Sequence, residues 1–246
     1  MDRNTPRIGC WLGLPSPEIA EIAAATGFDF AIVDLEHGPI GIETALRMLT
    51  ALATSPTVPW VRVPDPSEGW IKRALDAGAA TVVVPRVDDL DTARRLAGFA
   101  TYGPEGRRGV GVAVARATRW GRDALPYLAR WRATGGLALQ IESPDGLAIA
   151  AEMAAIPGVT QLFFGPSDYS AALGTGLDDP RVAEAGRAVA EVARSAGKEA
   201  GTVTFPGHGP AELGALGYTH VLDASDIALV VAAFDASLAA ARTSLS

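Results

Sequence analysis

The chain has 246 residues, of which 48% are hydrophobic and 20% are charged, and its formal net charge is −7. This length and apolar content suit one domain with a large hydrophobic core. The acidic balance, with no basic stretch that follows an aromatic pattern, argues against a nucleic-acid-binding protein. The single cysteine, Cys10, excludes an internal disulfide and fits a reducing cytosol.

Neither a targeting segment nor a membrane span is expected. The start, Met1-Asp-Arg-Asn4, lacks the apolar region of a signal peptide, and no apolar run approaches the roughly 20 residues that a membrane helix needs. No low-complexity linker divides the chain either. We therefore expect one domain over residues 1–246, located in the cytoplasm.

Short apolar strands alternate with helical segments along the chain. In order, we expect strand 8–13, helix 17–25, strand 30–33, helix 42–53, strand 58–63, a helix that Ser67 caps and that runs to 77, strand 81–84 and helix 88–100. After a long connection over 102–120, we expect helix 123–133, strand 136–141, helix 144–154, strand 161–164, helix 181–196, strand 199–204, helix 210–216, strand 220–222 and helix 227–241.

This alternation predicts an α/β fold, a single-domain (β/α)8 TIM barrel. A doubly wound open sheet is the alternative. The sequence has no Gly-x-Gly-x-x-Gly after its first strand, which weakens a dinucleotide-binding interpretation.

Polar side chains gather where the predicted strands end. The strand at 30–33 is followed by Asp34, Glu36 and His37, and the first strand ends near Trp11. Unpaired charges are costly to bury, so packing alone seldom accounts for such a strand end. A carboxylate three positions before a histidine is suited to orient the imidazole and raise its basicity, although a polar turn that stops a strand has the same composition. Because active sites of these barrels lie at the carboxyl ends of the strands, this pattern favours a catalytic face.

Glu142 and Asp168 form a candidate metal pair. They close the predicted fifth and sixth strands, and two carboxylates without nearby cysteine suit a hard divalent cation such as Mg²⁺, with Mn²⁺ or Co²⁺ as substitutes. The alternative is that each acid caps the helix that follows it.

Arg62 and a glycine turn are candidate substrate-binding elements. Arg62 lies on an otherwise apolar strand, and a buried arginine needs an anion, supplied by substrate or by a structural ion pair. The turn Gly165, Pro166, Ser167 and Asp168 offers free backbone N–H groups that suit a carboxylate.

The remaining basic residues narrow the chemistry. Lys72 and Lys198 are the only lysines, and neither is expected at the catalytic face, so imine chemistry is disfavoured. His220 begins the last strand and is expected at the opposite end of the barrel. His208 lies in a Gly-His-Gly-Pro segment, whose composition is typical of a mobile loop rather than of a fixed catalytic group. We therefore prefer His37 as the base.

These residues resemble the HpcH/HpaI family of class II pyruvate aldolases, over most of the chain and in family order. The stretches that carry the resemblance are Gly27-Phe-Asp-Phe-Ala-Ile-Val-Asp-Leu-Glu-His-Gly-Pro39, Val61-Arg-Val-Pro64, Ile71-Lys-Arg-Ala-Leu-Asp-Ala-Gly78, Val83-Val-Pro-Arg-Val87, Gly106-Arg-Arg-Gly-Val-Gly111, Gln140-Ile-Glu142 and Phe164-Gly-Pro-Ser-Asp168. One departure is Tyr169, where the family commonly has leucine.

The resemblance implies a metal-dependent barrel that forms and protonates a pyruvate enolate. It assigns the metal to Glu142 and Asp168, the base role to His37 paired with Asp34, and enolate stabilisation to Arg62. It makes Gln140 and Glu36 outer groups around the metal and its waters, places Trp11 in the pocket wall, and directs the backbone of Ser167 and Asp168 to the pyruvate carboxylate. It also implies a homohexamer with the last helix exchanged between neighbours.

The expected reaction cleaves or forms 4-hydroxy-2-oxo acids through an enolate of pyruvate or hydroxypyruvate and an aldehyde. Two alternatives keep the barrel: a citrate-lyase-like enzyme acting on a CoA ester, and a non-catalytic barrel that binds a small carboxylate. The sequence does not identify the aldehyde, the physiological metal, the direction of flux, or the roles of Arg107, Arg108 and the His208 loop.

Overall fold

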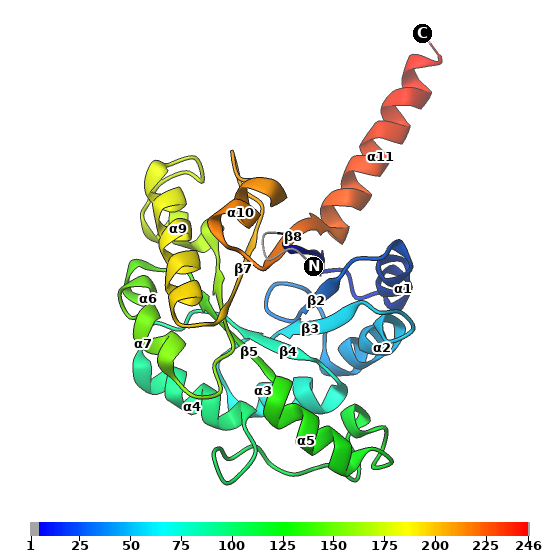
Figure 1. Ribbon diagram of the computed structural model, residues 1–246. Helices are drawn as coiled ribbons and strands as arrows, with labels where there is room; N and C mark the ends of the chain where they lie inside the picture. Colours follow the sequence, from blue (N-terminus) through cyan, green and yellow to red (C-terminus); the bar gives the residue numbers. More distant parts are fainter. Residues whose placement is uncertain (1–4, 246) are drawn as a thin grey trace.

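Eight parallel strands close into a barrel in the computed structural model, which describes residues 5–245 (Figure 1). Each strand pairs with the next in sequence, and β8 pairs with β1, which confirms the predicted (β/α)8 fold. The strands are β1 (Arg7–Leu12), β2 (Phe30–Asp34), β3 (Val58–Arg62), β4 (Thr81–Val84), β5 (Gly136–Ile141), β6 (Gln161–Phe164), β7 (Glu199–Val203) and β8 (His220–Ser225).

Helices surround the barrel and connect its strands (Figure 1). They are α1 (Pro17–Thr26), α2 (Ile42–Leu52), α3 (Glu68–Ala77), α4 (Leu90–Ala100), the 3-10 turn η1 (Arg116–Thr118), α5 (Ala124–Thr134), α6 (Pro144–Ala148), α7 (Ala150–Ala155), α8 (Pro166–Ala172), α9 (Pro180–Ser195), α10 (Pro210–Leu216) and α11 (Asp226–Thr243).

Helix boundaries follow local capping chemistry. Ser16 accepts a hydrogen bond from the N–H of Ile19 at the start of α1, and Gly27, at φ 95°, ends that helix in the left-handed region that glycine adopts without strain. Ser67 occupies the corresponding position before α3, as predicted, but its side chain makes no capping hydrogen bond.

Three elements differ from the sequence expectation. The helix expected at 144–154 is two helices, because Ile149 leaves helical geometry at φ −111° and ψ 10°. A further short helix, α8, begins directly after β6, with Pro166 in its first turn. Strand β8 extends to Ser225, beyond the expected residue 222.

Aromatic side chains fill the inside of the barrel. Phe30 lies with its ring centroid 4.7 Å from that of Trp60 and 5.2 Å from that of His220. A Cβ on Gly9 would lie 2.4 Å from the Phe30 ring, so this position needs glycine for the aromatic layer to fit. Nearer the carboxyl ends of the strands, Phe163 belongs to the same inner cluster and also lines a pocket there.

The last helix, α11, projects away from the barrel (Figure 1). Its first residue, Asp226, is buried, and its carboxylate accepts hydrogen bonds from the N–H of Gly13 and of Leu14, both at 2.9 Å. The helix is thus attached at its base while the rest of it is exposed. Within residues 5–245, no helix combines the length and apolar character needed to cross a membrane.

Candidate active site

Arg62 lies between two acids at the carboxyl ends of β2 and β3. Asp34 and Arg62 are direct register partners, so their side chains leave the sheet on the same side. Nε and Nη2 of Arg62 donate to the two oxygens of Asp34 at 2.9 and 2.8 Å, and Nη1 lies 2.9 Å from Glu36 Oε2. The guanidinium is therefore held in one orientation by two carboxylates.

Trp11 completes this arrangement from β1. Its Nε1 donates to Asp34 Oδ2 at 3.1 Å, and the Arg62 guanidinium carbon lies 4.4 Å from the Trp11 ring centroid. The indole thus packs against the arginine as a cation–π contact and fixes the same carboxylate.

Environment separates the pKa values of the two acids. Burial opposes ionisation of Asp34, but the hydrogen bonds and charge of Arg62 outweigh it and hold the Asp34 pKa below its usual value. For Glu36, burial dominates over the attraction of Arg62, and the charges of Asp34 and Asp168 add to it, so its pKa is raised. Asp34 is therefore the permanent counter-ion of the arginine.

Glu142 follows β5 and is buried beside neutral donors. Gln140 donates its side-chain N–H to Glu142 Oε1, and the backbone N–H of Arg86 donates to Oε2 at 3.0 Å. Arg86 adopts φ 54°, an uncommon conformation for a non-glycine residue. A Cβ on Gly165 would lie 2.7 Å from Glu142 Cγ, so only glycine at position 165 leaves room for the Glu142 side chain.

The surroundings of Glu142 disfavour its ionised form. Burial, reinforced by the negative charge of Asp168, raises the pKa of Glu142 to about 7. A cation beside this carboxyl would stabilise its ionised form. The buried Oε1 of Gln140 has no hydrogen-bond partner, although the amide nitrogen of the same side chain donates to Glu142.

The donors fit a hard divalent cation with few protein ligands. Two carboxylates and an amide oxygen are the ligand types that Mg²⁺ or Mn²⁺ accepts, and Mg²⁺ is commonly held by one or two carboxylates with the remaining positions filled by water and substrate. Among residues 5–245, no cluster of three or more His, Cys, Asp and Glu side chains is arranged to hold a metal. The fit thus rests on the Glu142 and Asp168 pair.

His37 lies at the open edge of the site. Its side chain is 67% exposed, and its Nε2 is 4.0 Å from Glu36 Oε1. The Asp34 carboxylate instead accepts the backbone N–H of His37, at 3.5 Å. The acid expected to orient the ring is thus engaged by Arg62 and Trp11, and Glu36 is the acid near the imidazole.

One pocket of about 340 Å³ collects most of the predicted site residues. Its lining includes the predicted residues Trp11, His37, Arg62, Gln140, Glu142, Gly165, Pro166, Ser167 and Asp168. Asp34 and Glu36 lie behind this lining, through their bonds to Arg62. The catalytic, metal-binding and substrate-binding roles of these residues remain predictions.

Three contributors were not singled out from the sequence. Phe163 and Val203 line the pocket, and the backbone of Arg86 binds Glu142. The two apolar residues look like ordinary barrel interior in the sequence. The Arg86 contact is made by main chain, which side-chain chemistry does not reveal.

The basic residues that were set aside lie elsewhere. Lys198 donates to the carbonyl of Val159 at 2.8 Å, and His220 is buried with Nε2 3.2 Å from Arg7. His208 stacks on Phe205 with 4.4 Å between ring centroids.

Arg107 and Arg108, which had no expected role, pack against aromatic rings. Arg108 is buried, donates to Asp76 Oδ1 at 2.7 Å and lies over Tyr102 at 4.4 Å. The Arg107 guanidinium lies 5.0 Å from the Phe99 ring centroid. Neither lines the pocket described above.

Residues 7–233 match the family model described as HpcH/HpaI aldolase/citrate lyase. The chain belongs to the HpcH/HpaI aldolase/citrate lyase family. This confirms the resemblance found in the sequence.

Relatives of this HpcH/HpaI chain agree in sequence and fold. A hydroxypyruvate/pyruvate aldolase of Deinococcus radiodurans is 41% identical over 232 residues, covering 93% of this chain and 83% of that protein. A 2-keto-3-deoxy-L-rhamnonate aldolase of Shigella sonnei is 39% identical, covering 79% of this chain and 73% of its own length. The crystal structure of a family protein from Burkholderia cenocepacia superposes with a TM-score of 0.89 at 31% identity, covering 97% of this chain and 95% of the other.

Proposed function

We propose that this chain is a divalent-metal-dependent aldolase that cleaves or forms 4-hydroxy-2-oxo acids through an enolate of pyruvate or hydroxypyruvate. The proposal is supported by a relative that is 41% identical to this chain in sequence and is named a hydroxypyruvate/pyruvate aldolase. The observation that carries the proposal is the buried Glu142, whose pKa of about 7 reflects burial and the charge of Asp168, in a pocket shared with Arg62. A pocket with two carboxylates and an arginine suits a bound metal cation next to the negatively charged oxygen of an enolate.

Glu142 and Asp168 would hold the cation, with Gln140 and Glu36 around it. Bound Mg²⁺, Mn²⁺ or Co²⁺ supplies Lewis-acid polarisation of the substrate keto group. We propose that any of these three cations can occupy the site.

The substrate carboxylate is proposed to lie at the start of α8. First-turn N–H groups have no helical acceptor, and the N–H of Tyr169, bonded to Gly165 O at 3.1 Å, is the first that has one. Ser167 and Asp168 therefore present N–H groups into the pocket end of this helix, where an anion is favoured.

Arg62 is proposed to stabilise the developing enolate oxygen. A fixed cationic donor helps most when it needs no reorganisation as charge develops, and the two carboxylates around Arg62 provide that fixation. Trp11 closes the wall behind the arginine.

His37 is proposed as the general base. It removes the C4 hydroxyl proton of the substrate, the C3–C4 bond breaks, and its electron pair becomes the enolate while the aldehyde leaves. The protonated His37 then gives its proton to C3 of the enolate, which yields the 2-oxo acid, and the reverse of this transfer exchanges the protons of the pyruvate methyl group. The exposed position of His37 beside Glu36 leaves room for aldehydes of different size.

Proton exchange at the pyruvate methyl group tests this assignment. NMR in D₂O would follow loss of the methyl signal with wild type, His37→Ala and a matched control, His208→Ala. We expect His37→Ala to exchange at least about 100-fold more slowly, the usual range for loss of a general base, and His208→Ala to match wild type. Exchange by His37→Ala at the wild-type rate would remove His37 from this role.

A CoA-ester lyase is the second candidate, and the pocket argues against it. Arg62 is its only arginine or lysine among the described lining residues, and that charge is already balanced by two acids. A nucleotide docking at the mouth would need free basic groups. Saturation-transfer NMR with CoA would detect such docking. A purely binding barrel, the third candidate, would bind oxo acids without metal and convert none.

We also propose a homohexamer in which α11 is exchanged between neighbours, as the family resemblance implies. The helix exposes Ile227, Leu229, Val231, Phe234 and Leu238. Exposed apolar residues on one helix are typical of a subunit contact. Light scattering should show that Phe234→Asp lowers the mass of the assembly, while Ile22→Asp, at an exposed apolar position on α1, leaves it unchanged.

The proposed location is the cytoplasm. Cys10 is unpaired and buried, which is compatible with a reducing compartment.

A further inference from the structure

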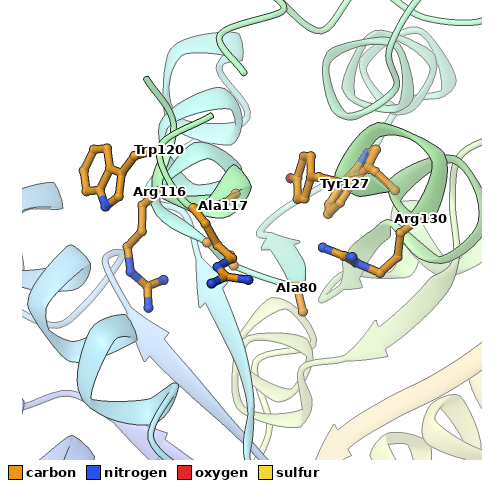
Figure 2. A pocket seen from close by; sticks show the side chains of 10 residues that line it. Ala80, Arg116, Ala117, Trp120, Tyr127 and Arg130 are labelled. Carbon is orange, nitrogen blue, oxygen red and sulfur yellow. The ribbon is translucent and has the colours of Figure 1, made fainter. Parts of the chain in front are cut away.

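A second pocket, of about 470 Å³, lies at the other end of the barrel (Figure 2). Residues 78–80, which lead into the amino end of β4, form part of its wall, and η1, the turn after η1 and α5 supply the rest. Its volume falls in the range of about 300–1,000 Å³ that is typical of small-molecule sites. None of the residues proposed for catalysis lines it.

The lining side chains of this pocket are strongly cationic. Arg116, Arg119 and Arg130 line it, and no acidic side chain does so among the described lining residues. Figure 2 shows Arg116 and Arg130 on opposite sides of the space, with Ala80 between them. One carboxylate at the edge, Asp123, lies 3.6 Å from Arg130. This excess of positive charge stands out in a chain whose net charge is −7.

Arg116 is held in place by neutral groups. It donates to the carbonyl oxygens of Ala77 at 3.0 Å and of Leu49 at 3.2 Å, which orient the guanidinium without neutralising it. A Cβ on Gly78 would lie 2.4 Å from Arg116 Nη1, so the arginine lies directly against bare backbone. Burial lowers the pKa of Arg116. An anion in the pocket would relieve this cost.

Aromatic rings border the same space. Trp131 donates its Nε1–H to Ala100 O at 2.9 Å and stacks on Tyr127 with centroids 6.0 Å apart, so this wall is rigid. Trp120, on the facing turn, is 58% exposed. A ring and a cation side by side suit a ligand that is both planar and negatively charged.

The turn that carries Arg119 and Trp120 is conformationally unfavourable. Both residues are left-handed, at φ 54° and 58°, although neither is glycine. The buried Thr118 stabilises the turn, since its hydroxyl lies 2.6 Å from Val112 O and accepts the N–H of Gly121 at 3.1 Å. Such conformations persist where surrounding contacts enforce them, and they cluster at ligand sites.

We propose that this pocket binds a small organic anion that carries a phosphate or carboxylate group on a planar body. The guanidinium groups of Arg119 and Arg130 bind the anionic group, with Arg116 as the fixed charge at the back of the pocket. Trp120 covers the planar body. Because the site lies at the amino ends of the strands, its ligand is separate from the substrate at the carboxyl ends.

Isothermal titration of the full chain, loaded with Mg²⁺ and saturated with pyruvate, tests the proposal at constant ionic strength. Adenosine monophosphate probes a phosphate on a planar body, and isophthalate probes a carboxylate. The variants are Arg119→Asn, Arg130→Gln and Trp120→Ala; asparagine tolerates the left-handed conformation at 119. The matched control is Arg94→Gln, an exposed arginine on α4 that does not line the pocket.

We expect saturable binding of at least one probe, weakened about tenfold or more in Arg119→Asn and Arg130→Gln, which each lose a charge-assisted contact. Arg94→Gln should bind within twofold of wild type, and aldolase activity of the variants should show that they are folded. Absence of saturable binding of both probes would overturn the proposal, as would equal weakening in Arg94→Gln. A changed assembly mass in Arg119→Asn with unchanged probe affinity would also overturn it, by assigning the arginines to a subunit contact.

Discussion

Arg62 binds both oxygens of Asp34 through Nε and Nη2, at 2.9 and 2.8 Å, across directly paired positions of β3 and β2. Because the third nitrogen is 2.9 Å from Glu36, every terminal group of the guanidinium faces a carboxylate. The arginine is oriented before any substrate arrives. The role as an oxyanion donor that we propose for Arg62 depends on that orientation as much as on its charge.

Arg62→Lys should therefore keep the charge and lose most of the activity. Lysine has no fork with which to bind Asp34 and Glu36 together, so its ammonium takes other positions. We expect kcat to fall by about 100-fold, in the range seen for loss of one oxyanion donor, with a smaller change in KM. Arg94→Lys serves as the control. Activity of Arg62→Lys within about threefold of wild type would contradict a role that needs the guanidinium geometry.

Asp34→Ala should destabilise the fold as well as the site. Removing one partner of a buried ion pair leaves an uncompensated charge, at a cost of about 3–5 kcal/mol. Glu36 remains beside Arg62, so we expect the lower end, about 3 kcal/mol, in urea unfolding at pH 7. A loss below about 1 kcal/mol would mean that Glu36 alone neutralises the arginine.

Metal affinity should depend steeply on pH. Burial and the charge of Asp168 raise the pKa of Glu142 to about 7, so below that pH the metal-free site holds a proton that the cation must displace. We expect Mn²⁺ affinity, measured by calorimetry, to rise about tenfold per pH unit from about 5.5 to 7 and then to level off. Glu142→Gln should bind Mn²⁺ at least about 100-fold more weakly. Affinity that stays constant between pH 5.5 and 7 would contradict the assignment of Glu142.

Borohydride should not inactivate the enzyme in the presence of pyruvate. An imine needs a lysine at the mouth, whereas Lys198 binds the Val159 carbonyl and Lys72 lies on α3, outside the pocket lining. Chelation should abolish activity, and Mg²⁺, Mn²⁺ or Co²⁺ should restore it. Mass spectrometry of the reduced protein would reveal a pyruvate adduct on either lysine if the reaction used an imine.

Acid should destabilise the barrel through His220. Burial, aided by the charge of Arg7, lowers the pKa of His220 from 6.5 to about 3. The unfolded chain binds this proton below pH 6.5 and the folded chain does not, so the contribution of neutral His220 is complete above pH 6.5 and is lost as the pH falls toward 3.

Urea unfolding of wild type and His220→Gln at pH 7, 6 and 5 isolates this group. The unfolding free energy of wild type should fall relative to that of the variant by about 1.4 kcal/mol per pH unit below 6.5. Parallel pH profiles for the two proteins would show that His220 titrates alike in the folded and unfolded chains.

The barrel was predictable because its information is local. Each buried strand is a short apolar run, and glycine or a polar cap marks most helix ends, as Ser16 and Gly27 do for α1. The convergence of site residues also followed from one rule, since parallel strands bring their carboxyl ends to one face. The sequence alone was therefore enough to group Glu142, Asp168 and Arg62 at one end of the barrel.

The partners of these residues were not predictable in the same way. The sequence showed that Arg62 needs an anion, but the strand register that supplies Asp34 is a property of the closed sheet. Spacing alone suggested Asp34 as the partner of His37, whereas the structure brings Glu36 to the imidazole. The contact of Arg108 with Asp76 joins positions 32 residues apart, and no local sequence pattern predicts it.

We propose above all that Glu142 and Asp168 hold one divalent cation in the pocket that contains Arg62. A crystal grown with Mn²⁺ and soaked with pyruvate tests it through the anomalous signal of manganese. We predict a single strong peak within coordination distance of both carboxylates, with the pyruvate keto oxygen facing Arg62. A manganese peak bound to only one of the two acids, or pyruvate bound in the pocket with no manganese beside it, would rule out a cation shared by Glu142 and Asp168.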